Sequence, residues 1–237
     1  MHPDLVKLLE LQSRDQALLE ADQRLDAVLA QLEALDAEAA EAARAAEAAH
    51  RAVADAQRRR QDLETKIENY KKLEERGKAR LDQVRSPREL AAVTTELDLA
   101  RSVLQKEEAD WIRLADTIAG LEVQARDADQ RLEQLKETQA VTRQALSEQL
   151  AAAEAARNAA RAERERAAQE VERVLRTRYE RLRAARRTKV VVALAGAACG
   201  ACYTTVPLNR RSQIQAGVLI DSCESCGVIL YSDDASE

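Results

Sequence analysis

Apolar residues recur every seven positions through most of this chain. One row steps by seven from Leu11 to Leu81, and nine of its eleven positions are apolar. A companion row, offset by three, reaches Val84, and a second pair of rows starts at Leu90 and Val93. Two such rows are the a and d positions of a coiled coil, and a period of seven predicts a left-handed supercoil. The pattern therefore predicts two long helices that pack along a shared seam.

The composition supports long helices. Charged residues make up 33% of the 237 residues and aromatic residues 2%, with six Gly, three Pro and no Phe. Up to about residue 188 the chain is dominated by Ala, Glu, Leu, Arg, Asp and Gln, of which all but Asp are good helix formers. The formal net charge is -5, so any contact with nucleic acid must be confined to a local basic segment.

A helix start signal separates the two halves of the repeat. Ser86 is suited to the N-cap, Pro87 to the first helical position, and Glu89 to closing a capping box. We expect one helix to end near Val84 and the next to begin at Pro87, although Gly77 offers a rival turn site. A turn at 85–87 makes the helices antiparallel, with each residue facing the one numbered about 173 minus its own.

The composition changes after residue 187. Short β-branched or apolar runs are separated by Gly, Asn and Cys, and they predict strands near residues 190–194, 204–208, 217–220 and 228–231. The expected fold is thus mainly α: an antiparallel coiled-coil hairpin over residues 1–188, then a small β segment over 189–237. Two Cys-x-x-Cys pairs in this segment mark it as a zinc ribbon. Because the ribbon has too few apolar residues to fold unaided, it requires a metal.

All four cysteines lie in this last segment, in two Cys-x-x-Cys pairs separated by twenty residues: Cys199, Cys202, Cys223 and Cys226. Four thiolates in this spacing are typical of one tetrahedral structural Zn²⁺. Disulfides or a redox pair are the alternatives, but the chain shows no secretory features and a redox motif needs no second copy. Gly200 and Gly227 lie where tight turns need permissive φ and ψ.

The closing segment Cys-x-x-Cys-Gly-Val-Ile-Leu-Tyr (223–231), the segment 175–182 before the ribbon and the Pro-Arg-Glu-Leu start at 87–90 resemble the bacterial C4-type zinc ribbon family. The resemblance covers essentially the whole chain. It implies a non-enzymatic protein, since relatives are linked to nucleic-acid binding and to chaperone or adaptor roles in transcription and flagellar assembly. Relatives usually carry Arg where this chain has Val228, so any contact made by that Arg is lost here.

Enzyme chemistry and membrane insertion find no support in the sequence. The two histidines, His2 and His50, lie in no catalytic arrangement, and no phosphate-binding glycine loop is present. We therefore expect no catalytic residues and no small-molecule substrate. The longest uncharged apolar run, residues 190–198, is far shorter than the roughly 20 residues of a membrane span. Without a signal peptide, the expected location is the cytoplasm, where thiols stay reduced.

A basic stretch suggests one function class, nucleic-acid binding. Residues 173–189 hold eight cations and one acid, and two more arginines lie in the ribbon. The candidate contacts, to RNA or another nucleic acid, are Arg176, Arg181, Arg183, Arg186, Arg187, Arg210 and Arg211. Cations near a helix C-terminus also favour the helix dipole, and residues 189–237 carry three cations against five acids. This reading is therefore kept as the alternative.

The leading interpretation is a zinc-binding interaction scaffold, adaptor or chaperone with a protein partner. Long hairpins offer side surfaces and a turn, and ribbons offer short strand edges. Residues 71–88 around the turn carry seven cations and three acids, which would favour an acidic partner surface, and a merely solvated turn is the alternative. The identity of the partner is beyond the sequence.

Overall fold

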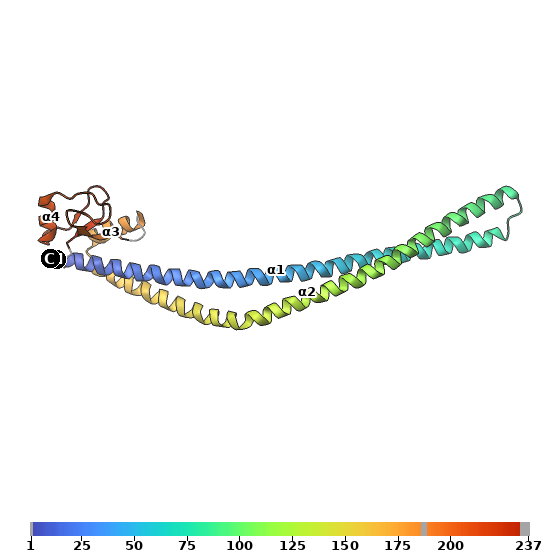
Figure 1. The fold of residues 1–237 in the computed structure, drawn as a ribbon, viewed down its shortest axis with the longest axis horizontal. Helices are drawn as coiled ribbons and strands as arrows, with labels where there is room; N and C mark the ends of the chain where they lie inside the picture. The colour runs from blue at the N-terminus through green and yellow to red at the C-terminus, as the bar shows by residue number, and fades with distance from the viewer. Residues whose placement is uncertain (1, 186–188, 233–237) are drawn as a thin grey trace. The chain divides into compact units, whose positions relative to one another are not determined.

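A computed structural model describes residues 2–185 and 189–232 of the chain. It confirms a mainly α fold in which two long helices pack together and a small sheet follows (Figure 1). The elements in chain order are α1 (Pro3–Leu81), α2 (Pro87–Glu170), α3 (Arg173–Ala185), β1 (Val191–Ala195), β2 (Ala198–Cys199), α4 (Leu208–Gln215), β3 (Asp221–Ser222) and β4 (Ile229–Tyr231).

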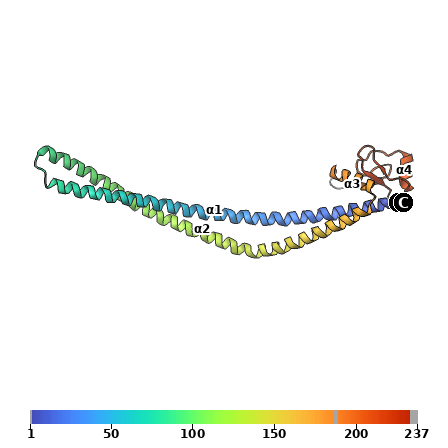
Figure 2. The ribbon, with the colours of Figure 1, turned by 180° about the vertical axis from the view of Figure 1, so that it is seen from behind.

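The chain forms two compact units. We call Met1–Leu32 together with Gln144–Glu237 the ribbon unit, and Glu33–Arg143 the turn unit. Each long helix contributes to both units. Figure 2 shows the same arrangement from behind, with α1 and α2 joined by the short turn. The two units are described separately below.

The turn forms where the sequence places it. Helix α2 begins at Pro87, and the Ser86 hydroxyl accepts the backbone N–H of Glu89 at 3.2 Å. This bond confirms Ser86 as the N-cap, because it satisfies one of the free N–H groups of the first turn. Helix α1 ends at Leu81, three residues earlier than expected, and the N–H of Val84 bonds to the Leu81 carbonyl at 3.4 Å.

The arms of the turn unit pack in nearly the expected register. The Lys66 Nζ lies 3.9 Å from a carboxylate oxygen of Glu107, the partner that the expected register gives. The His50 Nε2 lies 2.9 Å from a carboxylate oxygen of Asp129, six residues beyond the position that the expected register gives. Long side chains that reach diagonally across the seam produce such offsets. The buried seam positions of α2 in this unit follow the predicted a and d rows: Val93, Leu97, Leu104, Ile118 and Ala125.

The second arm is not one continuous helix, which departs from the expectation for residues up to 188. Helix α2 ends at Glu170, and the Glu172 carboxylate caps α3 by accepting the N–H groups of Val174 and Leu175 at 3.0 and 3.1 Å. Steps of seven from Leu90 lead to Val174, but the apolar row fails there, since Val174 is 72% exposed. The break allows α3 to bury Tyr179 in the core of the ribbon unit. The division at residue 188 stays a prediction.

The sheet has the order β2-β1-β4-β3, with a parallel pair β1·β4 flanked by two antiparallel pairs. Two of the four predicted strand segments become β1 and β4. The segment 204–208 forms only an isolated bridge, between Thr205 and Ala198, before α4 starts at Leu208. The segment 217–220 precedes β3. Helix α4 escaped prediction because it buries one residue only, Ile214, and shows no apolar period.

Two cores lie on opposite faces of the sheet. Because strand side chains alternate, Ile229 packs toward the helices, while Val228 and Leu230 pack toward the cysteines. The first core joins α1, α2, α3 and the sheet through Leu5, Leu8, Leu11, Ala167, Ala168, Val171, Tyr179, Val190, Val191 and Ile229. The second core contains Cys199, Val206, Ile214, Cys223, Val228 and Leu230.

Candidate metal centre

The four cysteines converge at one point of the ribbon unit. Their sulfur atoms all lie within 4.8 Å of one another, with 3.8 Å between Cys199 and Cys226 and 3.5 Å between Cys202 and Cys223. None of the four forms a disulfide. Four sulfurs placed about 2.3 Å from a central ion stand about 3.8 Å apart in a regular tetrahedron. The cluster therefore has the size of a tetrahedral thiolate site, and it can bind a metal ion.

The two Cys-x-x-Cys knuckles are built alike. In each, the carbonyl of the first cysteine accepts the N–H four residues later at 2.8 Å, and its N–H bonds to the carbonyl five residues later at 2.9 Å. The groups involved are Cys199 with Tyr203 and Thr204, and Cys223 with Gly227 and Val228. These bonds hold the two sulfurs of each knuckle on the same side of a tight turn, as metal binding requires.

The glycines of the knuckles act differently from each other. Gly227 has φ +78°, as expected for a tight turn, but Gly200 does not lie in the left-handed region. In the first knuckle, the residue with the left-handed backbone conformation is Tyr203, at φ +60°. Gly200 is needed for space, because a Cβ there would lie 2.4 Å from the Ala193 carbonyl oxygen. A left-handed backbone therefore accounts for Gly227, whereas lack of space for a Cβ accounts for Gly200.

The surroundings of the thiols shift their acidity in opposite directions. Hydrogen bonding to Thr204, 3.4 Å from the Cys202 sulfur, lowers the pKa of Cys202 to about 6, while burial raises the pKa of Cys226 to about 12. Four thiolates this close repel one another strongly unless a cation lies between them. An all-sulfur ligand set suits Zn²⁺ and other soft or borderline ions, and it leaves no coordination position for water or substrate.

Arg210 ties α4 to the second knuckle. Its guanidinium donates to the Asp221 carboxylate at 2.6 Å and to the Ser222 carbonyl at 2.7 Å, and it also pairs with Glu224. The hydrogen bond to Asp221 raises the pKa of Arg210. This arginine, predicted to contact nucleic acid, therefore supports the segment that carries Cys223.

Some of the other candidate nucleic-acid residues that the structure describes are engaged within the chain. Arg176 donates to the Ala168 carbonyl at 3.1 Å, and Arg183 lies 3.1 Å from the Asp15 carboxylate. Arg181 is exposed, and the buried Nε of Arg211 has no hydrogen-bond partner among the described residues. Arg186 and Arg187 lie outside the described residues. The nucleic-acid assignment remains a prediction.

A buried carboxylate that the sequence did not single out links the helices beneath the sheet. Asp15 is 7% exposed, accepts the Tyr179 hydroxyl at 2.7 Å and the Arg164 Nε at 2.9 Å, and neighbours Arg183. Burial, and then the bond to Asp15, raises the pKa of Tyr179. Burial alone would lower the pKa of Arg164, but hydrogen bonds to Asp15 and Glu180 outweigh it and raise the pKa.

Gln12 attaches the first helix directly to the sheet. Its amide oxygen accepts the backbone N–H groups of Val190 and Val191, each at 2.7 Å, and its amide nitrogen donates to the Val191 carbonyl at 2.9 Å. These bonds satisfy backbone groups at the start of β1 that would otherwise be buried without partners. Gln12 lies between seam positions in the repeat, so no periodic signal marked it. Gln12 thus anchors the cysteine-bearing sheet to α1, whereas Asp15 ties α1 to α2 and α3.

Comparisons with known proteins identify the fold. No family model and no curated protein matches this chain. Among solved structures, CT398 from Chlamydia trachomatis matches with a TM-score of 0.86 and 18% identity, over 97% of this chain and 98% of that one. A protein from Mycobacterium smegmatis has a TM-score of 0.65 and 20% identity, over 98% and 100% of the two chains. HP0958 from Helicobacter pylori has a TM-score of 0.56 and 18% identity, over 98% of both.

These similarities show that the whole architecture recurs in proteins of very different sequence. Every helix among the described residues is too short or too polar to span a lipid bilayer.

Proposed function

We propose that this chain is a non-enzymatic zinc-binding interaction scaffold of the C4-type zinc ribbon kind, acting as an adaptor or chaperone for a protein partner in the cytoplasm. The observation that carries the proposal is the closed cluster of four cysteine sulfurs within 4.8 Å. Such a site stabilises a fold and offers no open coordination position for catalysis. Zn²⁺ is the metal that fits an all-thiolate tetrahedron in a reducing compartment.

The attachment of the sheet supports a scaffold role. Gln12 and Asp15 connect α1 with β1 and α3 inside the ribbon unit. Metal-dependent folding of the sheet is thereby coupled to the position of a long helix. A rigid, metal-stabilised platform suits presentation of a binding surface, because little ordering is needed when a partner docks.

Exposed apolar side chains favour a protein partner. Tyr203, Leu208 and Val218 of the ribbon unit are 74%, 70% and 73% exposed. Side chains of this kind mark an interaction site where they form a contiguous patch. Tyr203 also holds a left-handed backbone conformation that is uncommon for a non-glycine residue, and such conformations gather at functional sites.

The test is recovery of a partner by the tagged, metal-loaded full chain from nuclease-treated cell extract. We expect a protein that copurifies in fixed ratio, survives nuclease treatment and binds the purified chain directly. The control is a Cys223→Ser variant, which should lose any partner that docks on the ribbon unit. Recovery that disappears with nuclease treatment would contradict the scaffold proposal and favour the alternative below.

The alternative is RNA binding, and one observation favours it. The exposed side of α3 forms a shallow groove of about 570 Å³ lined by Arg173, Val174, Thr177, Arg178 and Arg181. Phosphate contacts release counterions, so an Arg173→Glu/Arg181→Glu variant should lower the slope of log affinity against log salt by about one per lost contact. Arg126→Glu, an exposed position in the turn unit, is the matched control. Equal slopes for parent and double variant would remove this alternative.

A further inference from the structure

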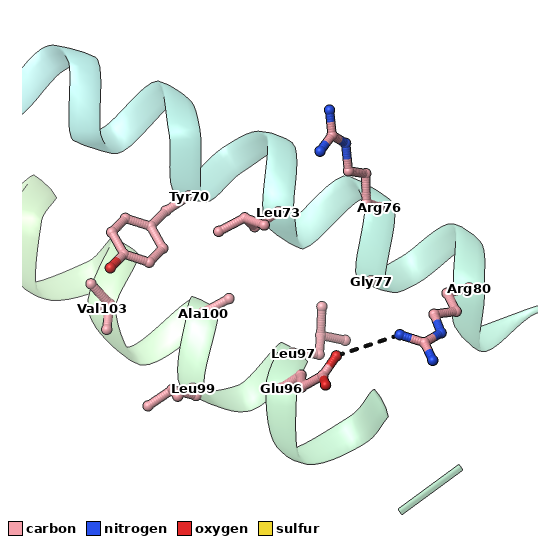
Figure 3. Close-up of a pocket in the computed structure, with 10 residues that line it drawn as sticks. All are labelled: Tyr70, Leu73, Arg76, Gly77, Arg80, Glu96, Leu97, Leu99, Ala100 and Val103. Carbon is pink, nitrogen blue, oxygen red and sulfur yellow. Dashed lines mark ion pairs between the residues drawn. The ribbon is translucent and has the colours of Figure 1, made fainter. Parts of the chain in front are cut away.

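We infer that the turn unit carries a docking groove for an acidic amphipathic helix of a partner protein. The inference rests on the proposed scaffold function and assigns it a surface. The groove, of about 460 Å³, lies between the two arms near the turn. Figure 3 shows the side chains that surround it: Tyr70, Leu73, Arg76, Gly77 and Arg80 from α1, and Glu96, Leu97, Leu99, Ala100 and Val103 from α2.

The seam is unusually tight at one end of this groove. Gly77 occupies a d position of the repeat opposite Leu97, and a Cβ at Gly77 would lie 3.0 Å from the Leu97 Cδ1. Leu97 is buried at 5% exposure and therefore fills the seam itself. Figure 3 shows Leu97 directed toward Gly77. Because Gly77 has no side chain, the two arms approach closely at this point. The larger apolar side chains nearby, Leu73 and Leu99, therefore lie at the groove and not inside the seam.

Large apolar side chains remain in water around the groove. Leu73 is 50% exposed and Leu99 is 66% exposed, one on each arm, and Figure 3 shows Tyr70 beside Leu73 on the α1 side. Along α1 the groove runs from Tyr70 to Arg80, about 15 Å or nearly three helical turns. A third helix packs between two helices by placing apolar residues at i, i+3 or i+4, and i+7 into such a groove. The dimensions and lining suit that occupant.

The charges around the groove indicate that the docking helix is acidic. Arg76 and Arg80 lie on the α1 side. Arg80 pairs with Glu96 only at 3.8 Å with both side chains mostly exposed, and Arg76 has no ion-pair partner in the described part of the chain. Residues 70–103, which span both arms of the groove, hold eight cations and six acids. Glutamate or aspartate along one flank of the docked helix would complement this rim.

Two other occupants fit less well. A second copy of this chain would bring the same cation-rich segment against its equivalent, and like charges across an interface cost affinity. Nucleic acid is bound through phosphates, whereas exposed leucines line this groove. Both occupants remain outcomes of the experiment.

The experiment uses designed capped helices of about 18 residues, with leucine at i, i+4, i+7 and i+11 and one glutamate-rich flank. A matched peptide carries lysine on that flank, and another carries alanine in place of leucine. Binding to the full-length, metal-loaded chain is measured by fluorescence anisotropy. The acidic peptide should bind at least about ten-fold more tightly than either matched peptide.

Variants then locate the site. Leu99→Asp and Arg76→Glu should each weaken binding of the acidic peptide by about ten-fold or more. The matched controls are Val141→Asp, at a position 78% exposed on the same helix, and Arg126→Glu, and both should bind like the parent. All four positions are exposed, so unchanged circular dichroism is expected for every variant.

The outcomes separate this inference from the proposed function. Equal binding by the parent and Leu99→Asp, or equal binding of the acidic and lysine peptides, overturns the groove assignment. Self-association in sedimentation that Leu99→Asp abolishes identifies a second copy as the occupant and also overturns it. If the nuclease-treated extract yields a direct partner that Leu99→Asp and Arg76→Glu still bind, the scaffold function stands while the groove assignment fails.

Discussion

The ribbon unit and the turn unit use the same kinds of residue to opposite effect. In the ribbon unit, Asp15 is 7% exposed and has three polar partners, so its charge is an obligatory part of the core. In the turn unit, polar pairs such as His50 with Asp129 lie at the surface, with both side chains at least half exposed. Surface pairs contribute little because water screens them, whereas breaking a buried network leaves a charge without compensation.

The difference indicates that the interactions most sensitive to substitution are concentrated in the ribbon unit, where the two ends of the chain pack together. The sheet, α3 and the start of α1 form a small core that depends on polar anchors and on the cysteine cluster. The arms depend on a repeated apolar seam, in which each contact resembles the next. Single substitutions should therefore have unequal effects in the two units.

The largest effect is expected at the metal centre. Replacing Cys223 by Ser removes one of four ligands, so metal content should fall from one ion to near zero per chain and the sheet should lose its fixed structure. The long helices should persist, because their seam contains no metal ligand. Metal analysis with near- and far-ultraviolet circular dichroism measures both results. The exposed neighbour Ser225→Ala is the control, and a Cys223→Ser protein with full metal content would contradict the assignment.

The next largest effect is expected at the buried carboxylate. Asp15→Ala leaves Arg164 and the Tyr179 hydroxyl without their partner, and unfolding free energy should fall by about 3–5 kcal/mol. The matched substitution is Asp22→Ala on the same helix, which removes an ion pair to Arg157 at 2.8 Å whose side chains are 40% and 41% exposed. That change should cost less than about 1 kcal/mol. Urea unfolding of both variants measures the contrast, and equal losses would refute it.

Glycine substitutions sharpen the comparison further. Gly200→Ala places a Cβ 2.4 Å from a backbone oxygen, so we expect a loss of about 1–3 kcal/mol from forced displacement. Gly120→Ala in the turn unit meets no atom within 4 Å and lies inside α2, where alanine favours the helix by about 1 kcal/mol. In thermal unfolding, Gly200→Ala should therefore lower the melting temperature and Gly120→Ala should raise it. A stabilising Gly200→Ala would show that the first knuckle has room for a side chain.

The smallest effect concerns pH. Burial and Asp15 raise the pKa of Tyr179 above its ordinary value near 10, so the folded protein holds this proton more tightly than the unfolded chain. The contribution of this proton to the free energy of unfolding is therefore complete below about pH 10. Above that pH it decreases by about 1.4 kcal/mol per pH unit. Tyr179→Phe should be less stable than the parent by about 1–3 kcal/mol at pH 8, with a difference that shrinks above pH 10. A difference independent of pH would contradict the proton linkage.

Local patterns determined much of this protein. The period of seven identified both long helices, the Ser86-Pro87 start signal placed the turn, and the cysteine spacing named the four sulfurs that the structure brings together. Each of these signals is carried by residues close in sequence, where backbone preference and helical geometry dominate.

Tertiary structure alone decided how the pieces join. The parallel pairing of β1 with β4, the packing of Tyr179 of α3 into the core and the burial of Asp15 each depend on residues far apart in the chain. The left-handed backbone of Tyr203 and the spatial need for Gly200 likewise appear only when the first knuckle packs against β1. A heptad pattern cannot predict such contacts. It shows which face of a helix is apolar, but not which distant residue packs against that face.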